Sequence, residues 1–374
     1  MLERQREALR ERLTRPGRPA SDDTHLEAAL AWLYRAQDAG DDRGVSHSYR
    51  IGRGWLPSYH ETTGYIIPTL LNLSEKRADP EARRRALEMA DWELTVQLPS
   101  GAIPNLVARE PVVFNTAQVV FGWLAAFRVT GDERFLTAAR RAGRWLVEVM
   151  DPDGAWRRYT GTAAGVIFYA RAAWALVELA SITGDEQFAA AARRFLAWSL
   201  DREEDEGWFS ENCLTDNDRP LLHTIAYAAQ GQLESGLALG GDARLVEAAT
   251  RTARALAARV RRDGWLAGRY ARRWRPEVRW ACLTGMAQIS IVWARLHGLT
   301  PEPVFAEAAE RVNRYLKATQ DLTSRNPGLR GGIRGSFPIH GAYLRYSVPN
   351  WATKFFLDAL LHAPSTGARA TYPG

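Results

Sequence analysis

The chain has 374 residues, of which 46% are hydrophobic and 25% are charged, a balance typical of a globular protein. The net charge of +6 favours an anionic partner, but no basic block with interleaved aromatic residues and no zinc-finger or RNP-like motif occurs, so we expect no nucleic-acid partner. The N-terminus lacks the apolar core of a signal peptide and no run of 18 apolar residues exists, so we expect a cytoplasmic protein with no membrane partner.

A sequence pattern recurs along the chain, most clearly in residues 130–156, 183–209 and 239–266. Each of these segments opens near a Gly-Asp pair, in which glycine suits the end of one helix and aspartate the N-cap of the next. An amphipathic helix rich in Ala and Arg follows, and a turn with a glycine ends the segment. The pattern predicts helices with charged outer faces over residues 24–38, 80–97, 133–150, 186–200, 242–261 and 301–319.

A second kind of helix lies between these segments. It is apolar on most sides and rich in small residues, which indicates a buried helix. We predict such helices over residues 61–73, 115–129, 165–182, 221–237, 282–297 and 350–362. Six outer helices that alternate with six inner ones form an all-α (α/α)6 toroid of helical hairpins. We expect one toroid domain over residues 21–363, an N-terminal extension over 1–20 and a C-terminal tail over 364–374.

The links from outer to inner helices are long and contain most of the Gly, Pro, Trp and polar residues. Their turn glycines are Gly44, Gly101, Gly154, Gly207, Gly264 and Gly331, at intervals of 57, 53, 53, 57 and 67 residues. The opposite links are short. Because loops on a rigid scaffold carry functional sites, we expect a ligand pocket at the rim formed by the long links and the first turns of the inner helices.

The rim residues combine aromatic rings, amides and arginines with few carboxylates, which suits a sugar that has an acidic group. We predict catalytic roles for His223, Tyr343, Tyr346, His340, Glu61 and Glu211. We predict substrate-binding roles for Tyr65, Asn115, Gln118, Tyr169, Trp208, Tyr227, Arg279, Arg334, Asn350 and Lys354. Each residue also has a purely structural interpretation, as a satisfied core group, a helix cap or a solvated edge.

The last link, from Gly331 to Phe356, ends the longest interval between turn glycines. Its glycines permit a tight backbone path, and Pro349 comes just before the last inner helix, where proline is tolerated. We expect this link both to close the ring and to line the pocket.

We expect no cofactor and no metal. The two cysteines, Cys213 and Cys282, are too few for a disulfide framework or a Cys-rich metal site. No G-x-S-x-G, HExxH or P-loop motif occurs, and no complete dinucleotide fingerprint. No local spacing of His, Asp and Glu resembles a zinc or calcium site.

Five segments are distinctive: "HETTGYIIPTLL", "FNTAQVVFGW", "PLLHTIAYAAQGQLE", "CLTGMAQISIVWARL" and "RGGIRGSFPIHGAYLRYSVPNWATKFFLDALL". They resemble a group of bacterial (α/α)6 proteins associated with exopolysaccharide biosynthesis loci. The resemblance extends from Glu27 to Leu361, and the architecture is more distantly similar to unsaturated glucuronyl hydrolases, polysaccharide lyases and the helical domain of glucuronyl C5-epimerases. The arginine-rich rim makes an acidic oligo- or polysaccharide the expected partner, and the resemblance assigns no catalytic residue.

The many Tyr, His and Arg residues favour chemistry at C5 of a uronate, as in an epimerase or a lyase. Such a reaction needs a base and an acid, together with a group that neutralises the sugar carboxylate. The candidate bases and acids are His223, His340, Tyr343, Tyr346 and Tyr227. The candidates for neutralising the carboxylate are Arg334 and Asn115.

Other functions stay open at this point. Glycoside hydrolysis needs two carboxyl groups, for which Glu61 can pair with Glu211, Asp216 or Asp218. A non-catalytic carbohydrate-binding or assembly protein would use the same pocket without an acid/base pair. A terpene-cyclase-like toroid is less favoured, because residues 215–218, "TDND", match an aspartate-rich motif only poorly.

Overall fold

The computed structural model describes residues 2–13, 19–107, 109–161 and 165–363. The expected C-terminal tail, 364–374, lies outside the described residues, as do residue 1 and residues 14–18 of the expected N-terminal extension. Within the described part of the chain, no helix is both long enough and apolar enough to cross a membrane.

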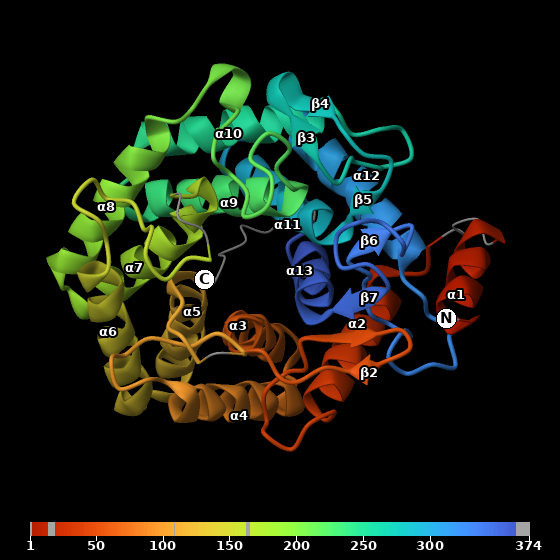
Figure 1. Ribbon diagram of the computed structural model, residues 1–374, viewed down its shortest axis with the longest axis horizontal. Helices are drawn as coiled ribbons and strands as arrows, with labels where there is room; N and C mark the ends of the chain where they lie inside the picture. The colour runs from red at the N-terminus through yellow and green to blue at the C-terminus, as the bar shows by residue number, and fades with distance from the viewer. Residues whose placement is uncertain (1, 14–18, 108, 162–164, 364–374) are drawn as a thin grey trace.

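The described chain forms two concentric rings of helices, which confirms the predicted (α/α)6 toroid (Figure 1). The outer ring consists of α2 (Asp22–Gln37), α4 (Pro80–Val96), α6 (Glu133–Glu148), α8 (Glu186–Leu200), α10 (Ala243–Ala257) and α12 (Pro303–Thr319). The inner ring consists of α3 (His60–Arg77), α5 (Val113–Thr130), α7 (Ala170–Thr183), α9 (Leu222–Ala238), α11 (Leu283–Leu299) and α13 (Asn350–Leu361).

The Gly-Asp pairs act at helix ends as the sequence predicts. The glycines Gly131 and Gly184 follow α5 and α7 in the left-handed conformation. The next aspartates, Asp132 and Asp185, accept a hydrogen bond from a backbone N–H in the first turn of α6 and α8. The short links between inner and outer helices are therefore fixed by local chemistry.

Two inner helices differ from the predicted boundaries by four or five residues, and the other four by one or two. Helix α3 contains Pro68 and continues to Arg77, because the residues after 73 are compatible with a helix and place Lys76 and Arg77 at its C-terminal end. Helix α7 begins at Ala170 rather than 165, and the short 3-10 helix η1 (Ile167–Tyr169) precedes it.

The ring closes through a close backbone contact between its last link and its first helix. Gly331 has φ +88°, and a Cβ placed on it would lie 2.2 Å from the carbonyl oxygen of Ala28 in α2. Gly101 has the same relation to Arg141 of α6, with φ +96° and a distance of 2.5 Å. Only glycine satisfies both the positive φ and the space, so in five of the six long links the turn glycine sets how the link rests on the next outer helix.

Short strands also fix the long links. Strand β1 (Ser48–Arg50) pairs antiparallel with β2 (Gly54–Trp55) and with β7 (Ser347–Pro349), which joins the first link to the last. The fifth link forms β3 (Tyr270–Ala271), η3 (Arg272–Trp274) and β4 (Arg275–Pro276). Strand β5 (Ala281–Cys282) pairs with β6 (Ser336–Phe337), and η2 (Asp205–Gly207) lies in the fourth link.

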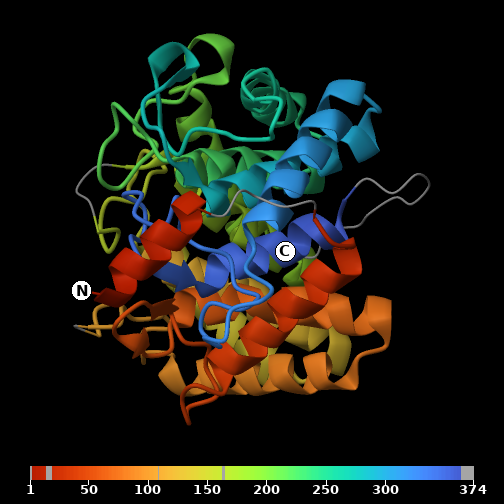
Figure 2. The same ribbon diagram turned by 90° about the vertical axis from the view of Figure 1, so that its right-hand side faces the viewer.

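The N-terminal helix α1 (Leu2–Leu13) packs on the last link, as Figure 2 shows for the red helix beside the blue segment. The carboxylate of Glu11 lies 2.8 Å from the guanidinium of Arg334 and accepts a hydrogen bond of 2.7 Å from the backbone N–H of Ile339. Arg10 pairs with Asp321 at 3.0 Å. The first residues of the chain therefore hold the outside of the link that closes the ring.

The inner helices approach one another most closely at glycines. A Cβ on Gly231 of α9 would lie 2.3 Å from the carbonyl carbon of Ala170 and 2.5 Å from the backbone nitrogen of Arg171, both in α7. Backbone atoms at such distances cannot move aside independently of the helix, so Gly231 sets the separation of α7 and α9.

We predict that Gly231→Ala lowers the free energy of unfolding by about 1–3 kcal/mol, because the added methyl group overpacks the contact between α7 and α9. Urea denaturation followed by circular dichroism measures this change. The matched control is Gly298→Ala in α11, where, apart from its chain neighbours and its own helix backbone, no atom of the described residues lies within 4 Å of the new Cβ. The control should unfold at the same or a higher urea concentration, and equal destabilisation of both variants would contradict the packing argument.

Candidate active site

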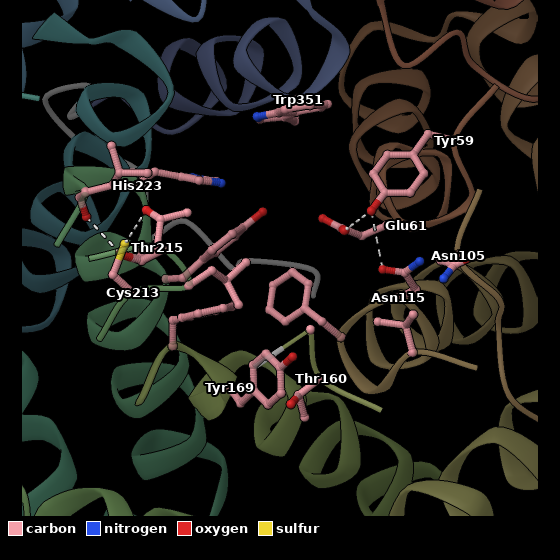
Figure 3. A pocket seen from close by; sticks show the side chains of 18 of the residues that line it. Tyr59, Glu61, Asn105, Asn115, Thr160, Tyr169, Cys213, Thr215, His223 and Trp351 are labelled. Carbon is pink, nitrogen blue, oxygen red and sulfur yellow. Dashed lines mark hydrogen bonds between the residues drawn. The ribbon is translucent and has the colours of Figure 1, made fainter. Parts of the chain in front are cut away.

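A pocket of about 1180 Å³ opens at the rim where the long links gather (Figure 3). All six outer-to-inner links contribute side chains to it. Its lining includes Tyr59, Glu61, Asn105, Glu110, Phe114, Asn115, Arg157, Tyr159, Tyr169, Cys213, Thr215, His223, Tyr227, Arg269, Tyr343 and Trp351. The pocket therefore depends on the closed ring, because each link supplies one part of the wall.

On one wall, Glu61 lies in the first turn of α3. Its Oε2 accepts a hydrogen bond of 2.7 Å from the Tyr59 hydroxyl. The amide of Asn115, held by a 3.0 Å bond from its Nδ2 to the carbonyl of Pro104, lies beside the same hydroxyl. Burial raises the pKa of Glu61 to about 7, although the bond from Tyr59 and the charge of Arg171 lower it. This carboxyl group can therefore hold or release a proton near neutral pH.

On the opposite wall, His223 lies in the first turn of α9, and Figure 3 shows it and Glu61 extending into the same space. The Nδ1 of His223 lies 2.7 Å from Oε1 of Gln288 in α11. An amide oxygen accepts, so Nδ1 carries the proton and Nε2 has a free lone pair. Burial lowers the pKa of His223 to about 4, which keeps the imidazole neutral and basic at neutral pH.

Two tyrosine rings lie beside the imidazole ring of His223. Its ring centroid lies 4.5 Å from that of Tyr227 and 5.5 Å from that of Tyr343. The hydroxyl of Tyr343 accepts a hydrogen bond of 2.8 Å from Nε1 of Trp351. Burial raises the pKa of Tyr343 and of Tyr227, so near neutral pH both groups are hydrogen-bond donors and not bases.

Aromatic rings form much of the remaining wall. Phe114 stacks on Tyr169 with ring centroids 5.5 Å apart and an angle of 26° between the planes. Trp351 lies on the other side of the pocket, with its ring edge-on to His47 at 4.8 Å. Flat apolar surfaces of this kind, next to a few polar groups, are typical of a site for a small organic ligand.

Six of the residues predicted from the sequence line this pocket. They are Glu61, Asn115, Tyr169, His223, Tyr227 and Tyr343. The structure brings together one carboxyl group, one imidazole, one amide and three phenol rings from five different inner-helix entries. Their individual roles stay predictions.

Four other predicted residues do not line the pocket and have partners inside the toroid. Gln118 accepts a hydrogen bond of 2.7 Å from Arg171, whose guanidinium also lies 5.7 Å from the ring centroid of Tyr65. Asn350 donates to the carbonyl of Ser46 and the hydroxyl of Thr62. Lys354 pairs with Asp358 at 2.7 Å.

The remaining predicted residues lie in the links and do not line the pocket either. Glu211 pairs with Arg202 at 3.2 Å, and Trp208 packs against Trp274 with ring centroids 5.2 Å apart. Arg334 pairs with Glu11 of α1 at 2.8 Å and donates to the carbonyl of Thr319 at 2.8 Å.

The last three predicted residues, Tyr346, His340 and Arg279, also lie in the links and do not line the pocket. The guanidinium of Arg4 lies over the ring of Tyr346 at 5.6 Å. His340 is half-buried in the last link, and Arg279 is exposed.

Several lining or supporting residues are not among the predicted site residues, and three of them are Tyr59, Gln288 and Arg269. Tyr59 is two positions before Glu61, and Gln288 is one turn inside α11, so both lie at inner-helix entries. Their hydrogen bonds to Glu61 and His223 show what each one does there. Arg269 precedes β3 and reaches the pocket through the fold of the fifth link. Among the described residues, no three His, Cys, Asp or Glu side chains are grouped as metal ligands.

No family model matches the chain, and no curated protein matches it. Solved structures do share its fold. An unsaturated glucuronyl hydrolase from Bacillus sp. GL1 aligns with a TM-score of 0.71 at 17% identity, over 91% of this chain and 96% of that one. Cellobiose 2-epimerase from Bacillus thermoamylovorans aligns with a TM-score of 0.72 at 14% identity, over 91% and 98%.

A third similar structure is an unsaturated glucuronyl hydrolase specific for heparin, with a TM-score of 0.72 at 16% identity over 92% of this chain and 97% of that one. These likenesses establish the toroid fold of the chain. They agree with the architectural similarity to glucuronyl hydrolases that the sequence indicates.

The raised pKa of Glu61 predicts a pH-dependent cost to stability. An unfolded glutamate has its ordinary pKa of 4.5, so the folded chain binds more protons between about pH 4.5 and 7. The free energy of unfolding therefore falls as pH rises through this window, and the cost is complete above it.

We predict that Glu61→Gln, which keeps an acceptor for Tyr59, is more stable than the wild-type protein at pH 8 by on the order of 2 kcal/mol. The advantage should vanish at about pH 4.5. Urea unfolding of both proteins at the two pH values measures it. An equal difference at both pH values would show that Glu61 is not destabilised by its burial.

Proposed function

We propose that the protein is a carbohydrate-active enzyme that binds an acidic sugar in the rim pocket and moves a proton at C5, beside the sugar carboxylate. One observation carries this proposal: the carboxyl group of Glu61 and the neutral imidazole of His223 extend into one pocket from opposite walls. Their pKa values, about 7 and about 4, make Glu61 an acid and His223 a base between those limits.

The pocket wall supports a sugar as the ligand. The faces of a pyranose ring are apolar and match the rings of Phe114, Tyr169 and Trp351, while its hydroxyl groups match amides such as Asn115. Proteins with the same fold include glucuronyl hydrolases and a cellobiose epimerase. The resemblance noted in the sequence makes an exopolysaccharide the proposed source of the glycan.

The reaction can be written with each proton placed. Nε2 of His223 removes the C5 proton, and the electron pair of the broken C–H bond moves into the sugar carboxylate to give an enediolate. The protonated carboxyl group of Glu61 then donates its proton to the opposite face of C5, which inverts the configuration. Groups on opposite walls fit this epimerisation. Expulsion of the C4 oxygen from the same enediolate would give the lyase outcome.

Hydrolysis is the second candidate, because a second carboxylate, Glu110, also lines the pocket. The two carboxyl groups of a glycosidase lie across the scissile bond. Two of the partners considered from the sequence are paired elsewhere, Glu211 with Arg202 and Asp216 with Arg219. Glu110 is exposed, whereas His223 is held in place by Gln288, and this contrast favours proton transfer at C5.

Incubation with a panel of acidic oligosaccharides in D2O tests the proposal. We predict that deuterium enters C5, followed by NMR, while the chain length, followed by mass spectrometry, does not change. Glu61→Gln and His223→Asn should each lower the exchange rate by a factor of about 100 or more, because each removes a general acid or base. The control is His297→Asn, at the far end of α11.

Other products would identify the other reactions. Shortening to saturated ends would establish hydrolysis, and unsaturated ends would establish the lyase outcome. Binding without exchange or cleavage would establish a non-catalytic carbohydrate-binding protein. If Glu61→Gln and His223→Asn keep the full exchange rate, as the control His297→Asn should, the reaction takes place elsewhere.

The same pair of groups predicts a bell-shaped pH profile. We expect kcat/KM to rise through about pH 4, where His223 loses its proton, and to fall above about pH 7, where Glu61 loses its proton. Tyr59→Phe removes a bond that stabilises the carboxylate, so the falling limb should move to higher pH. A falling limb that stays in place or moves to lower pH would exclude Glu61 as the acid.

A further inference from the structure

Two arginines line the pocket, and only one of them is already neutralised. Arg157 pairs with Asp151 at 3.0 Å and with Asp153 at 2.7 Å. Arg269 instead donates from Nη2 to the hydroxyl of Thr215 at 3.1 Å and from Nη1 to the carbonyl of Arg219. Within the described chain, no carboxylate forms an ion pair with Arg269.

The acidic residues near Arg269 in the sequence have other partners. Asp216 pairs with Arg219 at 2.8 Å, and Glu277 pairs with Arg275 at 2.9 Å. The positive charge of Arg269 at the pocket wall is therefore available to an anion from solution. A guanidinium with a planar set of donors binds a carboxylate better than it binds a hydroxyl group.

Backbone hydrogen bonds fix Arg269 relative to the proposed base. Residue 269 forms an antiparallel bridge with Leu221, two positions before His223. On either side, the N–H of Leu222 donates to the carbonyl of Gly268 at 3.0 Å, and the N–H of Tyr270 donates to the carbonyl of Pro220 at 3.2 Å. The guanidinium and the imidazole thus leave adjacent, bonded segments and enter the same pocket.

The pKa of a cysteine beside Arg269, Cys213, indicates which sign of charge this part of the pocket wall favours. The Sγ of Cys213 lies 4.0 Å from Nη1 of Arg269. Burial would raise the pKa of the Cys213 thiol, yet the pKa is lowered because backbone N–H groups of Thr215, Leu221 and Asp216 point at the sulfur. Cys282 is buried as well, and there burial raises the pKa to about 12. The corner around Cys213 therefore favours negative charge.

We propose that Arg269 and Thr215 form the subsite that binds the carboxylate of the acidic sugar. The proposal rests on the function proposed above and adds the group that selects the substrate. The guanidinium pairs with the carboxylate, and the Thr215 hydroxyl, which accepts from Arg269, donates its own proton to a carboxylate oxygen. C5 then lies next to the wall that bears His223, and Glu61 faces it from the other side.

The subsite has a role in the reaction as well as in binding. When the C5 proton leaves, negative charge grows on the two carboxylate oxygens of the enediolate. A fixed cation at those oxygens stabilises this charge more strongly in a partly desolvated pocket than in water. Arg269 is thus placed to lower the barrier and to exclude neutral sugars, which leave its charge unpaired.

Equilibrium binding tests the subsite without turnover. The probes are three pairs of trisaccharides. One member of each pair is built from glucuronate, mannuronate or galacturonate, and the other is the neutral trisaccharide with the same linkage and configuration. Isothermal titration calorimetry gives Kd for each. We expect the wild-type protein to bind at least one uronate about 10- to 100-fold more tightly than its neutral counterpart, the range that a charge-assisted hydrogen bond provides.

Substitutions assign this preference to one side chain. Arg269→Gln should abolish it, and Arg269→Lys, which keeps the charge but not the planar donors, should retain part of it. Thr215→Val should reduce it about three- to tenfold. Arg272→Gln is the matched control, because Arg272 lies in the same link, is exposed and pairs with Glu204. Thermal melting of each variant establishes that the link stays folded.

The results separate the two proposals. If the wild-type protein binds both members of every pair equally, or binds none, there is no carboxylate subsite. If Arg157→Gln and not Arg269→Gln abolishes the preference, the subsite lies at Arg157 and our assignment is wrong. If Arg269→Gln abolishes the preference but no C5 exchange occurs in the wild-type protein, the subsite stands and the proposed reaction fails. C5 exchange with unchanged KM and kcat in Arg269→Gln would overturn the subsite alone.

Discussion

The guanidinium of Arg171 is fully buried where five of the six inner helices meet. It donates to Oε1 of Gln118 in α5 at 2.7 Å and to Oε1 of Gln230 in α9 at 3.0 Å. Rings of α3, α5, α7, α9 and α13 surround it with centroids between 5.1 and 5.7 Å from its Cζ. A buried charge is costly unless polar groups and ring faces replace water, so this contact holds the inner ring in one arrangement.

The charge of Arg171 also affects the pKa values of two groups in the pocket, Glu61 and His223. Burial raises the pKa of Glu61, and Arg171 acts against that rise. For His223, burial lowers the pKa and Arg171 lowers it further. A cation that belongs to the core thus moves the two groups in the same direction, toward ionised Glu61 and neutral His223. The spacing of the two pKa values, about 7 and about 4, follows from burial in a ring that has its own charge at the centre.

Most of the fold can be predicted from local sequence patterns. Gly-Asp caps, apolar inner helices and turn glycines are short-range signals, and they gave the twelve helices within a few residues. The site was predictable where a residue lies in the first turn of an inner helix, as Glu61 and His223 do. It was not predictable where a distant partner decides the position. Arg334 contacts Glu11 of α1, more than 300 positions away, and Arg269 depends on the bridge to Leu221.

Depth along the inner helices accounts for three of the other predicted residues, Tyr65, Gln118 and Lys354. Side chains in the first turn, such as Glu61, Asn115 and His223, reach the pocket. Tyr65, Gln118 and Lys354 lie about one turn deeper and face the interior, where each polar group needs a fixed partner. Tyr227 lies as deep in α9 and still lines the pocket, whereas Asn350 in the first turn of α13 is bonded in the core. Lys354 is an example of a deeper group with a fixed partner. Burial lowers its pKa to about 8, and the carboxylate of Asp358, which also accepts a hydrogen bond from Thr69, favours the protonated ammonium group. Of the charged residues on the inner helices, Glu61 in the first turn of α3 thus serves the pocket, and Lys354 one turn deeper in α13 serves the core.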